Sequence, residues 1–127
     1  MRSLLFGMVM IAGSASAQVD LDSLRSITND TSKPDSVRFT AYYDLVWDGY
    51  LFSDPDTAQT MARWLQTAAR KKGQPVFVAR ASELLAATWY VRGELRTALL
   101  HYDTALALHK SNHDEDGYAD VITNMAS

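Results

Sequence analysis

The sequence repeats itself when it is shifted by 40 residues. Leu45, Leu85 and Met125 then align, and the same offset pairs Val46 with Ala86 and Ala126, Tyr50 with Tyr90, and Ala58 with Ala98. A fixed period of this length is typical of stacked helical repeats, because one repeat alone cannot bury its apolar face. The period therefore predicts an all-α fold, an α-solenoid of antiparallel helix hairpins, with an extended surface for partners.

Composition and charge narrow the class of protein. The 127 residues are 47% apolar and 21% charged, with a net charge of −3, which is typical of one small soluble domain. Nucleic-acid binding needs clustered Lys and Arg, and the only basic cluster, Arg70-Lys71-Lys72, falls at an expected helix C-terminus, where cations favour the helix dipole. We therefore expect no nucleic acid to bind this segment.

The first 17 residues have the pattern of a secretory signal peptide. Arg2 is followed by an apolar run from Leu4 to Ala12 and then by small residues ending in Ala15-Ser16-Ala17. The run is shorter than the roughly 20 apolar residues that span a bilayer. We therefore predict export to the periplasmic or extracytoplasmic side of a bacterial membrane, with cleavage after Ala17. The chain has no cysteine, so disulfides, thiolate nucleophiles and a lipoprotein anchor are excluded.

Helix start and stop signals divide the remaining chain into a leader and three repeats. Asp35-Ser36 and Asp54-Pro55 are typical helix starts, and Gly73 and Gly93 are typical stops. Helices are expected at about 20–29, 35–51, 55–72, 75–91 and 94–111. The resulting regions are a leader helix and linker at 18–34, repeat 1 at 35–74, repeat 2 at 75–113 and the start of an incomplete repeat 3 at 114–127.

Repeat 2 resembles a tetratricopeptide repeat. The alternation of small and large residues in that family is matched in order by Leu85, Ala86, Trp89, Gly93, Ala98, Tyr102 and Ala105. Repeat 1 has Leu45 and Ala58 in place but carries Ala62 and Leu65 where a large and then a small residue are usual. The resemblance implies that Leu45, Ala58, Leu85, Ala86, Trp89, Ala98, Tyr102 and Ala105 pack the repeats together.

A narrower resemblance suggests the context of these repeats. A signal peptide, a leader helix and Asp54-Pro55-Asp56 at the second helix of repeat 1 are similar to the exported N-terminal regions of bacterial signalling proteins. There, such repeats precede a membrane span and a histidine kinase, cyclase or DNA-binding module. The resemblance implies an extracytoplasmic sensory region; the alternatives are a stand-alone exported scaffold and the repeat appendage of an exported enzyme.

No motif for catalysis, cofactor binding or metal binding occurs in the chain. Phosphate-binding glycine loops and nucleophile elbows are absent. His109 and His113 are four residues apart, but Ser111 and Asn112 should end the helix between them. We therefore expect a solvated turn here, with Asp114 and the following acids capping the next helix, no metal, no cofactor and no enzymatic activity in this segment.

The family resemblance also implies where a ligand would bind, because its first helices line an inner groove. The groove positions carry over onto Tyr43, Trp47, Tyr50, Arg80, Glu83 and Tyr90, together with Thr40 and Ala87. Tyr, Trp and Arg are enriched in binding hot spots. Asp44 and Leu84 disfavour the family's clamp for peptide carboxylates. The expected partner is a protein or peptide, with self-association through the open end of the array as a second expectation and membrane contact only through a C-terminal span.

Overall fold

The computed structural model describes residues 20–126, which form six α-helices and no β-strand. The predicted all-α class is therefore confirmed, whereas the predicted signal peptide lies outside the described residues. Within this range no helix is both long and apolar enough to cross a membrane. The helices are α2 (Leu21–Asn29), α3 (Asp35–Gly49), α4 (Pro55–Lys71), α5 (Pro75–Val91), α6 (Leu95–Ser111) and α7 (Glu115–Ala126).

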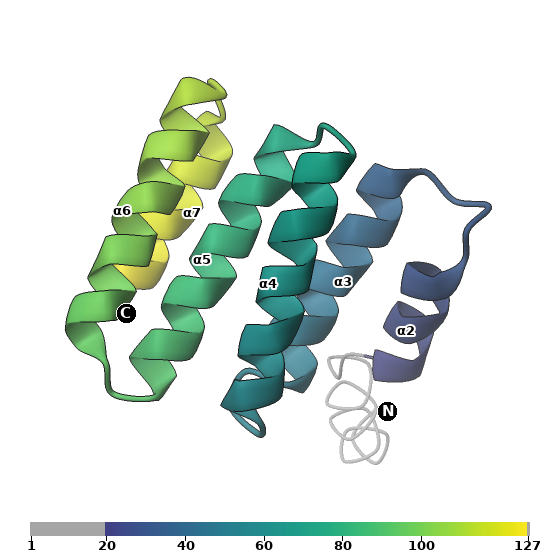
Figure 1. Cartoon of the computed structure of the whole chain (residues 1–127), viewed down its shortest axis with the longest axis horizontal. Coiled ribbons are helices and arrows are strands. Elements are labelled where there is room, and N and C mark those ends of the chain that lie inside the picture. The colour runs from purple at the N-terminus through teal and green to yellow at the C-terminus, as the bar shows by residue number, and fades with distance from the viewer. Residues whose placement is uncertain (1–19, 127) are drawn as a thin grey trace, which may run out of the picture.

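Consecutive helices pack side by side in antiparallel pairs, from α2 at one end of the molecule to α6 and α7 at the other (Figure 1). α3 contacts α5 as well as α4, and α5 packs on both α4 and α6. The helices thus fall into two rows. We call α3, α5 and α7 the inner row and α4 and α6 the outer row.

Three of the connections between helices have the same geometry at an interval of 20 residues. Gly73, Gly93 and His113 all have a positive φ, of 64°, 84° and 57°. In each turn the N–H of the next residue donates to a carbonyl in the preceding helix, at 2.9 Å each time. Left-handed backbone closes a helix C-terminus and is easiest for glycine. These turns fold each helix back against its predecessor.

Side-chain caps begin three of the helices. The carboxylates of Asp20, Asp54 and Asp114 accept the N–H of Ser23, Thr57 and Gly117, at 3.1, 3.2 and 3.0 Å. Asp54 therefore caps α4, as its position before Pro55 predicts, and Asp114 likewise caps α7.

The end of α3 differs from its prediction. The helix ends at Gly49 instead of Leu51, because the N–H groups of Tyr50 and Leu51 both donate to the carbonyl of Val46. Leu51 is still buried. A Cβ atom at Gly49 would lie 3.2 Å from the side chain of Leu21, so the glycine allows α2 to approach α3 closely.

The hydrophobic core has a large cluster on α3, α4 and α5 and a smaller one on α5, α6 and α7. Ala58 and Ala98 are both buried where the outer-row helices approach the inner row. Trp89 is only partly buried, and its indole Nε1 has no hydrogen-bond partner among the described residues. The other residues predicted to pack the repeats are also buried, namely Leu45, Leu85, Ala86, Tyr102 and Ala105.

Candidate ligand groove

A cavity of about 210 Å³ opens on the inner row, where α3, α5 and α7 lie next to one another. All three helices of the inner row contribute to it. Its walls are Tyr43 and Trp47 from α3, Glu83 from α5, and Asp120, Thr123 and Asn124 from α7. Three of the six predicted groove residues, Tyr43, Trp47 and Glu83, therefore line one hollow.

Glu83 is at the floor of this groove and joins the three helices. It is only 2% exposed, and its carboxylate accepts a hydrogen bond from the side-chain amide of Asn124 and another from the hydroxyl of Tyr43. Burial raises the pKa of Glu83 above its usual range, although the hydrogen bonds from Asn124 and Tyr43 oppose this shift. The groove therefore contains a carboxylate that burial disfavours in its charged form.

Two stacked aromatic rings form the α3 wall. The ring centroids of Tyr43 and Trp47 are 6.1 Å apart, with 11° between their planes. Burial, and next the charge of Glu83, raise the pKa of the Tyr43 hydroxyl, so the phenol stays neutral and can donate. The guanidinium of Arg80 lies 5.7 Å from the Tyr43 ring centroid and 5.5 Å from that of Phe77. Arg80 thus packs on the wall and does not line the cavity.

Two predicted groove residues lie elsewhere. Tyr50 faces the leader helix, where its hydroxyl accepts a hydrogen bond from Arg25 at 3.2 Å. Tyr90 lines a separate hollow of about 180 Å³ with Leu95, Leu99 and Met125 among others. Of the two further carried-over positions, Thr40 lines a hollow between α2 and α3, and Ala87 is buried. Both misplaced tyrosines come at the ends of their helices, beyond the part of the inner row where three helices meet.

Three groove residues were missed from the sequence, and all three come from α7. Asp120, Thr123 and Asn124 stand 40 residues after Arg80, Glu83 and Leu84. Applying the 40-residue period once more would have placed them in the groove. Asp120 also affects the titration of the groove, because its negative charge raises the pKa of both Glu83 and Tyr43.

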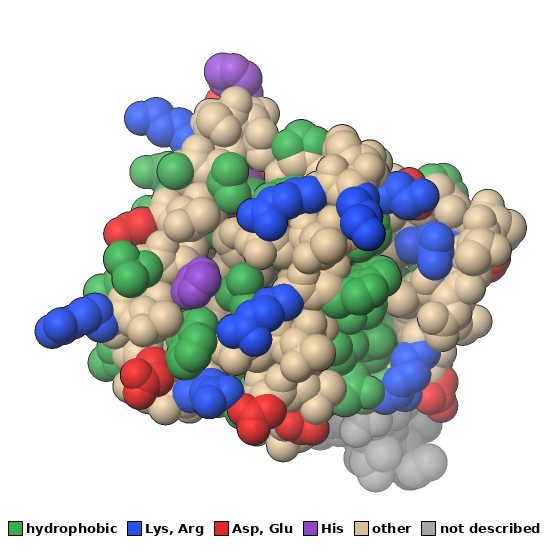
Figure 2. Space-filling view, viewed as in Figure 1, with side chains coloured by type: hydrophobic (Ala, Val, Ile, Leu, Met, Phe, Trp, Pro, Cys, Tyr) green, Lys and Arg blue, Asp and Glu red, His purple; other side chains and the backbone are tan. Residues whose placement is uncertain are grey.

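The two rows carry opposite charge. The outer row has five basic and two acidic side chains, and Lys and Arg spread over the face that it forms (Figure 2). The inner row has seven acidic and two basic side chains. The acids are Asp35, Asp44, Asp48, Glu83, Glu115, Asp116 and Asp120, and the bases are Arg38 and Arg80. The groove thus lies on the acidic side of the molecule.

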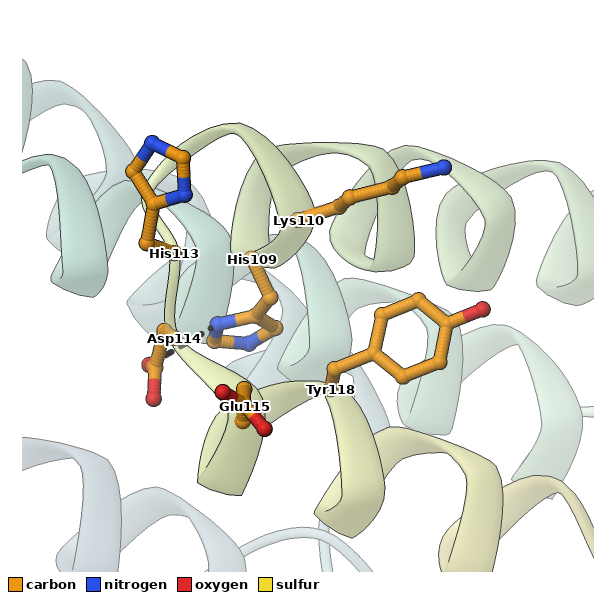
Figure 3. Close-up of a pocket in the computed structure, with 6 residues that line it drawn as sticks. All are labelled: His109, Lys110, His113, Asp114, Glu115 and Tyr118. Carbon is orange, nitrogen blue, oxygen red and sulfur yellow. Dashed lines mark hydrogen bonds and ion pairs between the residues drawn. The ribbon is translucent and has the colours of Figure 1, made fainter.

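A larger hollow, of about 440 Å³, lies at the turn between α6 and α7. His109 reaches between the two helices there, while His113 and Lys110 point away from it (Figure 3). Nδ1 of His109 is 3.1 Å from the Asp114 carboxylate, and Nε2 has no partner among the described residues. No group of three or more metal-ligating side chains occurs in residues 20–126.

The prediction of a solvated turn is wrong for His109, whose side chain is completely buried. The reason is the residue that faces it. A Cβ atom at Gly117 would lie 2.3 Å from Nδ1 of His109, so only glycine leaves room for the imidazole. Burial lowers the pKa of His109, against the opposing effect of Asp114. The neutral ring is therefore a packing group between α6 and α7.

No protein-family model matches the chain, and neither a curated protein nor a solved structure is similar to it.

Proposed function

We propose that the chain is a non-catalytic module that binds a protein or peptide segment in the groove of its inner row. The observation that carries this proposal is the construction of the cavity. Tyr43, Glu83 and Thr123 line it from α3, α5 and α7 at intervals of 40 residues, and Trp47, Asp120 and Asn124 lie within one helical turn of them along the sequence. An elongated partner can contact several such repeats at once, which is how stacked helical arrays bind.

We further propose that the helices form a tetratricopeptide-like solenoid. The resemblance of residues 79–110 to that family supports this, as do the recurring left-handed turns at Gly73, Gly93 and His113. The signal-peptide pattern of residues 1–17 supports an extracytoplasmic location, and the narrower sequence resemblance supports a sensory or scaffold role in signal transduction. Sequencing the N-terminus of the exported protein tests the predicted cleavage after Ala17, and an intact Met1 would contradict that cleavage.

A peptide-display selection tests the binding proposal. The full chain is immobilised, and the enriched peptides are measured against Trp47→Leu, which removes one groove wall, and against Trp64→Leu as a matched control. Trp64 is an aromatic residue of the outer row and is half exposed. We expect Trp47→Leu to weaken binding at least about tenfold, as for a hot-spot aromatic, and Trp64→Leu to have little effect.

Circular dichroism is the control for folding, since both tryptophan variants must retain the helical content of the parent chain. A selection that enriches no peptide, or peptides that bind Trp47→Leu as tightly as the parent, would exclude the groove as the binding site.

A further inference from the structure

The groove combines two features that are separately common and together selective for a cation. Its α3 wall is an aromatic stack, and its other walls carry the carboxylates of Glu83 and Asp120. Aromatic faces attract ammonium and guanidinium groups, and the attraction increases where water is excluded. A carboxylate placed beside such a face adds a charge-assisted hydrogen bond to the same group.

The chain already makes this kind of contact within its own inner row. The guanidinium of Arg80 lies over the ring of Tyr43, at 5.7 Å from the centroid. The negative charges around it exceed this single positive charge, since Asp44, Glu83 and Asp120 all act electrostatically on Arg80 or on its neighbours. Arg80 alone therefore does not neutralise the negative charge around the groove.

Size limits what the groove can hold. At about 210 Å³ the cavity is smaller than the roughly 300–1,000 Å³ of small-molecule and cofactor sites. It suits one long side chain of a partner whose backbone runs along the inner row. The charge separation of the two rows agrees with this, because a basic segment is attracted to the inner row and repelled by the outer row.

Glu83 is the residue that a packing role explains least. Burying a carboxylate costs free energy unless it is paired. The hydrogen-bond partners of Glu83, Asn124 and Tyr43, are neutral, and the charge of Arg80 opposes the effect of burial on the Glu83 pKa only in part. The carboxylate therefore has a use if a further positive charge approaches it.

From these observations we infer that the groove binds a lysine or arginine side chain of a basic partner segment, held between the Tyr43–Trp47 stack and the carboxylates of Glu83 and Asp120. This inference rests on the proposed function and gives the chemistry of its ligand. Arg80 and Asn124 are positioning residues in this arrangement, because they hold Tyr43 and Glu83 in place.

Three synthetic peptides of equal length test the inference, one with three lysines, one with three glutamines and one with three glutamates at the same positions. Each is titrated into the ¹⁵N-labelled full chain and followed by NMR and calorimetry. We expect only the lysine peptide to bind, to shift the Trp47 indole signal, and to bind less tightly as salt is added.

Matched acid-to-amide variants locate the binding. Asp120→Asn and Glu83→Gln each remove one groove charge, whereas Asp103→Asn removes the same charge from α6 in the outer row. We expect each groove variant to weaken the lysine peptide at least about fivefold, as for a partly buried ion pair, and Asp103→Asn to change its affinity less than twofold. Circular dichroism confirms that Glu83→Gln retains the fold.

The outcomes separate the inference from the proposed function. Binding of the glutamine or glutamate peptide at Trp47 in place of the lysine peptide overturns the inference but leaves a peptide groove. Equal weakening by Asp103→Asn and Asp120→Asn overturns the inference, since it shows general charge attraction. Absence of any groove binding, both here and in the display selection, overturns both.

Discussion

The α4–α5 and α6–α7 junctions have the same helix–turn–helix connection, but different side chains pack between their helices. At the first junction, between α4 and α5, Ala69 precedes the turn and Phe77 follows it. At the second, between α6 and α7, the equivalent residues are His109 and Gly117. All four are buried. Each junction thus combines a small residue with a large one, but the order is reversed.

A second exchange of the same kind occurs within the outer row. α4 has Ala62 and then Leu65, and α6 has Tyr102 and then Ala105 at the equivalent places. All four are buried. In both exchanges a small and a large buried residue trade places between equivalent sites, which close packing accepts more readily than two large residues together.

Polarity also differs between the junctions. In the first, the Gln59 amide donates to Thr88 Oγ1 at 3.2 Å, and the Gln66 amide donates to Ser82 Oγ at 3.1 Å. In the second, Leu99 and Leu106 take the places of the two glutamines. Leu106 packs against the smaller core cluster, whereas Leu99 is half exposed. The first junction is thus specified partly by hydrogen bonds that the second does not have at these positions.

The largest expected effect comes from breaking the size exchange at the second junction. Gly117→Phe places a ring where even a Cβ atom would clash with His109, so we expect it to lower the free energy of unfolding by about 3 kcal/mol or more. Adding His109→Ala restores the Ala–Phe pair of the first junction and should recover part of that loss, because the Asp114 carboxylate, 2.5 Å from a Cβ atom at position 117, must still move aside. Urea unfolding followed by circular dichroism measures both.

The mirror pair provides the control. Ala69→His with Phe77→Gly should tolerate the exchange better than Ala69→His alone. If the double variant at 109 and 117 unfolds as easily as Gly117→Phe alone, the two sites do not exchange volume and the comparison fails.

The next effect tests the polar contact of the first junction. Thr88→Val leaves the buried Gln59 amide without its acceptor, so we expect a loss of about 1–3 kcal/mol. Gln59→Leu should cost less than about 1 kcal/mol, because the Thr88 hydroxyl still donates to the carbonyl of Leu85 at 2.7 Å and leucine is an apolar side chain of similar size. Equal losses in the two variants would mean that packing, not hydrogen bonding, governs the site.

The helices could be predicted from the sequence because their signals are local. Asp54 before Pro55 and the glycines at 73 and 93 each act within one turn of the chain, and the structure places helix ends beside them. His113 gave no such signal, although its backbone adopts the same left-handed conformation as the two glycines.

The groove could be predicted only in part, because its shape depends on how three helices stack. Tyr43, Trp47 and Glu83 meet there, but the third wall comes from Asp120, Thr123 and Asn124 of α7, whose place depends on how α7 packs against α5. The burial of His109 likewise depends on the absence of a side chain at Gly117. Both are consequences of tertiary contact that no local pattern contains.

Acid should weaken the second junction through His109. Because burial lowers its pKa in the folded state, the unfolded chain binds the proton more readily below about pH 6.5. Stability is therefore lost as the pH falls below that value, by at most about 1.4 kcal/mol per pH unit for one proton. The charged groups that act on the ring are Asp114 in the turn, Arg80 on α5 and Asp120 on α7.

Asp114→Asn sharpens this test. Asp114 holds the pKa of His109 up, so the variant should lower that pKa further and steepen the loss of stability between pH 6.5 and 5. NMR titration of the imidazole and thermal unfolding at each pH measure the two effects. A His109 midpoint above 6.5 in Asp114→Asn would show that the ring is not desolvated. Glu83, whose pKa is raised, contributes with the opposite sign, so both chains are also compared in a Glu83→Gln background.

The smallest expected effect comes from exchanging histidine and glycine in the equivalent turns. His113 has the left-handed backbone that Gly73 and Gly93 adopt in the equivalent turns, and this conformation costs a non-glycine residue about 1 kcal/mol. His113→Gly should therefore raise the free energy of unfolding by up to about 1 kcal/mol, and Gly93→His should lower it by a similar amount. A Cβ atom at Gly93 would meet no other atom within 4 Å, so backbone conformation alone decides that variant. If Gly93→His is neutral, the turns tolerate side chains equally, and the glycines at 73 and 93 are not what closes the helices.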